Sequence, residues 1–148
     1  MSDDPASKPR TPWHVWVVGI VSLLWNAMGA MDFTLTETHN ASYLGKVTAE
    51  QLAYIDGFPV WVIVAWGVAV WGGVLGSALL LFRCRSAVPV FLISIIAVVV
   101  TFTHNYLLTD GMKIMGGPGA LVFSAVIFVI ALLLWLYACA MRRRGVLR

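Results

Sequence analysis

The chain alternates between four long apolar runs and shorter polar stretches. The runs extend over about residues 13–35, 59–82, 87–108 and 119–141. The second belongs to a stretch of 25 uncharged residues, 58–82. At about 1.5 Å of rise per residue, a helix of that length exceeds the roughly 30 Å hydrocarbon core of a bilayer. We therefore predict an all-α polytopic membrane protein, folded as an up-down bundle of four transmembrane helices.

The polar stretches predict how these helices are connected. Thr48 and Gln51 have the spacing of a capping box, and Leu52 and Ile55 form an apolar edge just after it. This pattern indicates a short interfacial helix in the first outer loop. Residues 1–11 are expected to be a flexible cytoplasmic tail, residues 12–141 the membrane domain, and residues 142–148 a basic cytoplasmic tail.

The first apolar run also has some features of a cleavable signal peptide. Lys8 and Arg10 precede an apolar core, and the small residues around Ala27 could form a cleavage site. The apolar character nevertheless continues beyond that point to Leu35. We therefore expect the first run to be retained as a transmembrane helix.

Composition and charge support a membrane protein and suggest its orientation. The chain is 60% hydrophobic and 11% charged, with a formal net charge of +3 and a mean hydropathy of +0.87. The basic residues lie at helix ends, which argues against a nucleic-acid surface. Eight of the ten lie in the two tails and the second loop, with only Lys46 in the first loop and Lys113 in the third. By the positive-inside rule both termini are cytoplasmic.

Small residues recur along one side of the second apolar run. Such residues let membrane helices approach closely, because lipid provides no hydrophobic drive for their association. The same spacing would allow packing against the protein's own helices, a second copy or another membrane subunit. The predicted helix-packing face comprises Ala65, Ala69, Gly72, Gly73, Gly76 and Ser77.

A few polar residues fall near the predicted outer ends of the first and third helices. Helical rise places Asp32 and His104 at similar depth, each about 25 Å or more from the inner end of its helix. We predict a polar cluster at the outer face that could bind a cation or a small polar solute. In the alternative reading, these residues meet interfacial water and only end their helices. The candidate members are Asp32, His104, Asn105, Glu37, His39 and Asp110.

No pattern in the chain indicates catalysis, a cofactor or a metal. There is no CxxC, HExxH or glycine-rich phosphate loop. His14 lies at the opposite end from His39 and His104, which excludes a haem held between two histidines of one copy. Cys84 and Cys139 lie near the predicted cytoplasmic side, where thiols stay reduced. We predict a protein that is not an enzyme, has no catalytic residues and binds neither cofactor nor metal.

Four segments of the chain resemble a known family. They are SLLWNAMGAMDF (22–33), EQLAYIDGFPVW (50–61), VWGGVLGSALLLFR (70–83) and GGPGALVFSAVIFVIAL (116–132). The chain is similar to small four-helix proteins of alphaproteobacterial genomes that carry the label "sugar transporter". The resemblance covers nearly the whole chain and implies the bacterial inner membrane, but it brings no catalytic residues. Sugar transport by only four helices would require an oligomer.

Two functional hypotheses follow. The first is an accessory or interaction subunit whose small-residue face docks on another membrane protein. The second is a small-solute transporter that acts as a homo-oligomer, with the outer polar cluster as its entry site. The lipid bilayer is the one partner that both hypotheses require, and the substrate stays unknown.

Overall fold

The computed structural model describes residues 10–148, in which every regular element is helical. The expected flexible tail falls mainly on residues 1–9, which lie outside the described residues. Four helices are long and apolar enough to cross a membrane, as the sequence predicts. They are α1 (Trp13–Glu37), α4 (Val60–Leu81), α5 (Ala87–Thr103) with its continuation η1 (His104–Leu108), and α7 (Pro118–Arg143).

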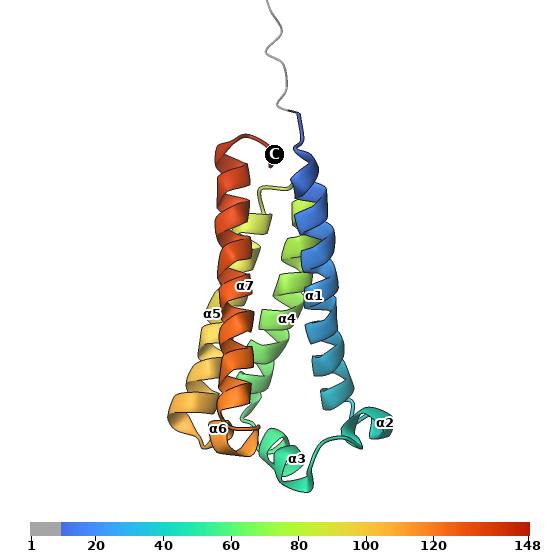
Figure 1. Ribbon diagram of the computed structural model, residues 1–148, viewed down its shortest axis with the longest axis vertical. Coiled ribbons are helices and arrows are strands. Elements are labelled where there is room, and N and C mark those ends of the chain that lie inside the picture. The colour runs from blue at the N-terminus through green and yellow to red at the C-terminus, as the bar shows by residue number, and fades with distance from the viewer. Residues whose placement is uncertain (1–9) are drawn as a thin grey trace, which may run out of the picture.

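The remaining helices are short and lie together at one end of the molecule (Figure 1). They are α2 (Ala41–Leu44), α3 (Ala49–Asp56) and α6 (Gly111–Ile114). The predicted capping box of α3 is present, because the Thr48 hydroxyl accepts from the Gln51 backbone N–H and the Gln51 side chain accepts from the Thr48 N–H. We call this end of the molecule the loop end.

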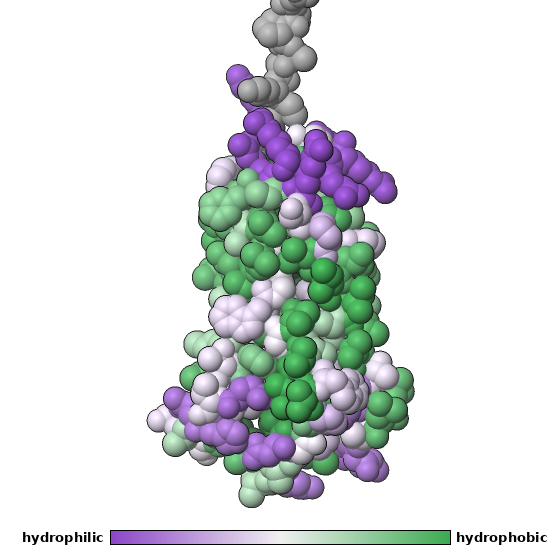
Figure 2. Space-filling view, turned by 180° about the vertical axis from the view of Figure 1, so that it is seen from behind, coloured by the Kyte–Doolittle hydropathy of each residue, from purple (hydrophilic) through white to green (hydrophobic). Residues whose placement is uncertain are grey.

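The long helices lie side by side, and their arrangement separates hydrophobic from hydrophilic surface. Figure 2 shows a hydrophobic band between two hydrophilic ends. The first described residues and Arg148 lie at the end opposite the short helices (Figure 1). All the described arginines belong to the segments at that end, which we call the arginine end. This distribution is that of a multi-pass membrane protein.

Helix α4 lies between α1 and α5 and packs closely on both (Figure 1). A Cβ atom added at Gly73 would lie 2.2 Å from the Asn26 Oδ1 of α1, and one added at Gly76 would lie 2.7 Å from the Phe91 ring of α5. The Asn26 amide also donates to the Ser77 hydroxyl at 3.1 Å. The predicted small-residue face therefore contacts the chain's own helices on two sides.

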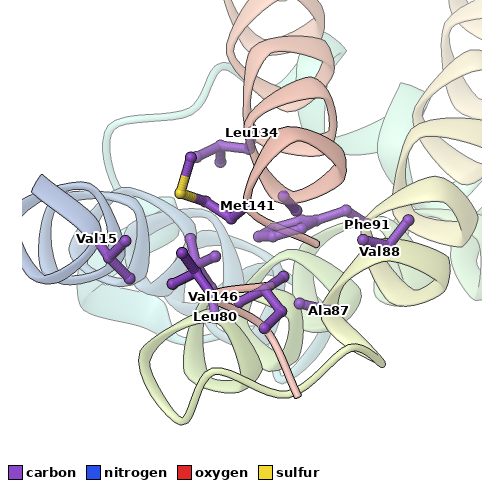
Figure 3. Packing of buried hydrophobic residues seen from close by; sticks show 10 residues of the cluster. Val15, Leu80, Ala87, Val88, Phe91, Leu134, Met141 and Val146 are labelled. Atoms are coloured by element: carbon purple, nitrogen blue, oxygen red, sulfur yellow. The ribbon is translucent and has the colours of Figure 1, made fainter. Parts of the chain in front are cut away.

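The arginine end is closed by a compact apolar cluster. Its buried members come from all four long helices and from residues 145–148, which we call the return segment. Figure 3 shows Leu80, Met141 and Val146 converging from α4, α7 and the return segment. Leu80 and Leu147 are both fully buried. The complete set is Val15, Leu80, Ala87, Val88, Phe91, Leu134, Ala138, Met141, Val146 and Leu147.

The return segment, within the expected basic tail over residues 142–148, packs onto the bundle. Gly145 has a φ of 69°, which favours glycine, and reverses the chain just after α7. The backbone N–H of Val146 then donates to the Met141 carbonyl at 3.0 Å, and that of Gly145 donates to the Arg142 carbonyl at 3.1 Å. These two bonds form a Schellman motif, whose hydrophobic contact places Val146 beside Met141 in the core. Two apolar residues after an arginine run are therefore core residues.

Candidate functional site: the groove between α1 and α7

The bundle is open on one side, because α1 and α7 barely contact one another. A cavity of about 480 Å³ lies between them, with a floor formed by α4 and α5. A second cavity of about 420 Å³ continues towards the loop end and shares lining residues with the first from all four long helices. We call this continuous space the groove. Residues that line both of its parts are Asp32, Tyr43, Trp66, Ala69, Val70, Val98, Phe123 and Ile127.

The part of the groove with a volume of about 480 Å³, which we call the deep part, is largely apolar. Its uncharged polar side chains from α1 and α5 form hydrogen bonds within the bundle. The Asn26 amide donates to the Ser22 carbonyl and the Ser77 hydroxyl, and the Ser94 hydroxyl donates to the Ala69 carbonyl at 2.6 Å. Apart from Asp32 and Tyr43, the remaining lining residues are aliphatic, aromatic or glycine.

Among the described residues that line the deep part, Asp32 is the charged one. It is partly buried near the end of α1. The hydroxyl of Tyr43, from α2, donates a hydrogen bond to its Oδ1. That bond is the main reason why the pKa of Tyr43 rises to about 12, with burial and the charge of Asp32 adding to it. Tyr43 therefore stays protonated and acts as a donor to the carboxylate.

Among residues 10–148, Tyr43 is the one hydrogen-bond partner of the Asp32 carboxylate. An ionised carboxylate offers about four lone-pair positions, and Tyr43 uses one. The ion pairs formed by the described residues are His39–Asp56 and Lys113–Asp110, and neither includes Asp32. Four aromatic side chains stand around the same space: Trp25, Tyr43, Trp66 and Phe123.

His104 lies on the other side of α4 and does not join Asp32. It is buried at the start of η1, where its ring meets those of Phe58 and Trp61 edge to face at 5.3 and 5.4 Å between centroids. Its Nδ1 lies 3.2 Å from the Asn105 Oδ1. This environment is a packed aromatic corner, with no hydrogen bond to Asp32 among the contacts of the described residues.

Asn105 connects that corner to the loop end of the groove. Its Oδ1 accepts from the Tyr54 hydroxyl at 3.2 Å, and Tyr54 also lies 2.6 Å from the Thr109 hydroxyl. Thr109 in turn donates to the His104 carbonyl at 3.0 Å, which satisfies a backbone group in the wider π-helical turn. Asn105 and Asp32 both line the loop-end part of the groove.

The other members of the predicted cluster lie outside the groove. His39 Nε2 is 3.0 Å from an Asp56 oxygen, and Asp110 pairs with Lys113 at 3.1 Å. Both pairs are exposed. Glu37 ends α1 and is not among the groove residues. The six predicted residues therefore divide into a groove pair, Asp32 and Asn105, the buried His104, the half-buried Glu37 at the end of α1, and two exposed residues at the loop end, His39 and Asp110.

Sequence reasoning missed Tyr43 and Trp66, which contribute to both parts of the groove. Trp66 lies in the middle of an apolar run, where its hydrophobicity gives no separate signal. Tyr43 lies in a polar loop, and only the fold of α2 brings it to Asp32. Among residues 10–148, no group of three or more His, Cys, Asp and Glu side chains is arranged to hold a metal.

Comparisons with family models, curated proteins and solved structures give no match for this chain. The resemblance to the small alphaproteobacterial membrane proteins therefore stays a prediction.

Proposed function

We propose that this chain is a multi-pass membrane protein that binds an amphipathic organic cation in the groove between α1 and α7. The setting is an up-down bundle in the bacterial inner membrane with both termini in the cytoplasm. The distribution of Lys and Arg supports that orientation, and the resemblance supports the choice of membrane. In this setting α3 lies along the outer surface of the membrane. The groove opens sideways to the lipid and, at the loop end, to the outer loops.

The size of the groove favours a small molecule over a protein helix. One turn of a helix, about 10 Å wide and 5.4 Å long, occupies roughly 420 Å³. The two parts of the groove, of about 480 and 420 Å³, together have the volume of only about two turns, whereas a spanning partner helix has five or more. The volume falls in the range of small-molecule sites, about 300–1,000 Å³.

The charge of the groove favours a cation, and this observation carries the proposal. Asp32 is held by a single tyrosine hydroxyl beside an apolar cavity. Carboxylates inside membrane helices are costly unless they meet a counter-charge. Trp25 and Trp66 line the same space and can attract a cation through their ring faces. Lys46 lines only the part at the loop end, where its ammonium reaches water.

The accessory-subunit hypothesis would need a docking surface other than the small-residue face. Gly73, Gly76 and Ser77 pack against α1 and α5 of the same chain, so that this face has no room for another subunit. The transporter hypothesis keeps its entry site in a modified form, as the groove. Release towards the arginine end would require the apolar cluster there to open.

The test uses two probes of the same shape and opposite charge, tetraphenylphosphonium and tetraphenylborate. Their binding to the purified protein in lipid nanodiscs is measured by titration calorimetry, with quenching of tryptophan fluorescence as a second readout. We expect the phosphonium to bind and the borate to bind at least tenfold more weakly. Asp32→Asn should weaken phosphonium binding at least tenfold, about 1.4 kcal/mol.

Asp110→Asn is the matched control, because Asp110 is exposed and pairs only with Lys113. It should leave phosphonium binding unchanged. Thermal unfolding of each variant checks that the fold is intact. Equal binding of the two probes, or phosphonium binding that survives Asp32→Asn, would overturn the proposal.

A further inference from the structure

The arginine end brings together three basic segments that are distant in sequence. The backbone N–H of Arg148 donates to the Arg83 carbonyl at 2.7 Å, and the N–H of Arg85 donates to the Arg148 carbonyl at 3.0 Å. The Arg85 Nε also donates to the Leu147 carbonyl at 3.4 Å. The Arg83 side chain donates to the Thr11 hydroxyl and so reaches the start of α1. The return segment thus holds this surface in one arrangement.

The charge of this surface is uncompensated within the described chain. It carries seven arginines, and the described acidic residues all belong to α1 after its midpoint, to the loop-end segments or to their turns. The ion pairs of the described residues, His39–Asp56 and Lys113–Asp110, also lie at the loop end. The seven are Arg10, Arg83, Arg85, Arg142, Arg143, Arg144 and Arg148.

Helix ends do not compensate that charge. The C-terminal ends of α4 and α7 lie at the arginine end, and so do the N-terminal ends of α1 and α5 (Figure 1). Their partial charges, roughly −0.5 and +0.5 each, cancel. The seven guanidinium groups therefore keep their mutual repulsion. That repulsion is lowered when anions bind among them.

We propose that the arginine end is a binding site for the headgroups of anionic phospholipids. The basic residues Arg142–Arg144 follow directly on the buried Met141 at the end of an apolar helix, which places them at the depth of lipid phosphates. Guanidinium groups bind phosphate oxygens through two parallel hydrogen bonds. An annular lipid in contact with α7 presents its phosphate at this depth without leaving the bilayer.

The choice of arginine supports this ligand. Among residues 10–148, the seven cations at this end are all arginine, and the two lysines, Lys46 and Lys113, lie in the loops of the opposite end. Orientation alone is satisfied by either residue. Bidentate phosphate contacts favour arginine.

The experiment compares the whole protein in nanodiscs of phosphatidylcholine with nanodiscs that also contain phosphatidylglycerol. Thermal unfolding and native mass spectrometry are the readouts. We expect phosphatidylglycerol to raise the unfolding temperature by several degrees and to be retained as bound lipid after detergent extraction. Replacing Arg142, Arg143 and Arg144 together by Gln should remove most of both effects. These side chains are exposed and have no hydrogen bonds within the described chain, so the variant should fold.

Replacing Lys46 and Lys113 by Gln is the matched control, because it removes the cations of the other end and should change neither readout. Inorganic phosphate in place of the lipid should give no stabilisation at millimolar concentration. Equal retention of phosphatidylglycerol by the arginine variant would overturn the proposal. So would equal stabilisation by inorganic phosphate, which would indicate a site for free anions, or equal retention of phosphatidylcholine, which would indicate unselective annular lipid.

Discussion

Helix α4 packs tightly against α1 and α5, whereas α1 and α7 leave a groove between them, although both regions are built from apolar residues. Around α4 the helices touch through glycine and serine, with no room for one more carbon atom at Gly73 or Gly76. Between α1 and α7 comparable side chains leave a cavity of about 480 Å³. Lipid provides little drive to close such a gap, because a helix face in contact with acyl chains is already in an apolar environment. Close packing between membrane helices therefore depends on complementary surfaces, as at Gly73 and Gly76. A groove filled by lipid chains has little free-energy cost in the bilayer.

The largest effect is expected when leucine replaces a glycine in the tightly packed region or, for comparison, a glycine that lines the groove. Gly73→Leu should destabilise the protein by about 3 kcal/mol or prevent folding, because its Cβ alone would overlap Asn26 Oδ1. Gly29→Leu should be tolerated, because a Cβ there lies 3.6 Å from the nearest Val70 atom and the side chain enters the groove. It should also weaken phosphonium binding. Thermal unfolding measures the stability of each variant, and titration measures its phosphonium binding. Equal loss of stability in the two variants would contradict the difference in packing between the two regions.

A second test removes side-chain volume in place of adding it. Leu80→Ala creates a cavity in the fully buried cluster at the arginine end, and we expect a loss of about 2 kcal/mol. Ile127→Ala removes a similar volume from the wall of the groove, where space is already open. Its cost should be well below that of Leu80→Ala. Reversible unfolding in mixed micelles compares the two, and a larger cost at Ile127 would contradict the structure.

A smaller effect is expected where the chain reverses after α7. Gly145→Ala forces a side chain into a φ of 69° and should cost about 1 kcal/mol. Gly119→Ala, in α7, adds a methyl group to open space and should be neutral or slightly stabilising. Protease cleavage after Arg144 gives a local readout, because loosening of the return segment should accelerate it only in Gly145→Ala.

The smallest effect concerns the pH dependence of the loop end. The pKa of Tyr43 is raised to about 12 chiefly by its bond to Asp32. A raised pKa adds stability that is fully present below pH 10 and is lost as pH rises towards 12. Solvent exposure of Tyr43 reduces this contribution to less than about 1 kcal/mol. The stability difference between the native chain and Tyr43→Phe should therefore shrink above pH 10, and a constant difference up to pH 12 would exclude the hydrogen bond as its cause.

The four long helices could be predicted because helix length and hydropathy are local properties. The capping box at Thr48 and Gln51 is local too, and it forms as expected. The pairing of Asp32 with His104 could not be judged in this way. Helical rise gives their depth along the bundle, but contact also depends on the position around it, and α4 lies between the two helices that carry them.

The return segment shows a second limit of reading a sequence locally. Val146 and Leu147 follow three arginines, and a window over residues 142–148 is polar. Both are buried in the same cluster as Leu80 and Met141. Leu80 precedes Val146 by 66 positions and Met141 precedes it by five. Gly145 was the available signal, since glycine just after a helix often reverses the chain.

Helix α7 is attached to the rest of the bundle mainly along α5, and to α1 through the hydrogen bond between His14 and Tyr137 at 2.5 Å. That bond lies at the arginine end, whereas at the loop end α7 is hydrogen-bonded to η1, with the Tyr106 hydroxyl 2.6 Å from that of Ser124, and no hydrogen bond of the described residues joins it to α1 there. Outward tilting about the bond between His14 and Tyr137 would widen the mouth of the groove. Lateral pressure from the surrounding acyl chains opposes such tilting, so thicker or more ordered bilayers should slow the exchange of a bound molecule.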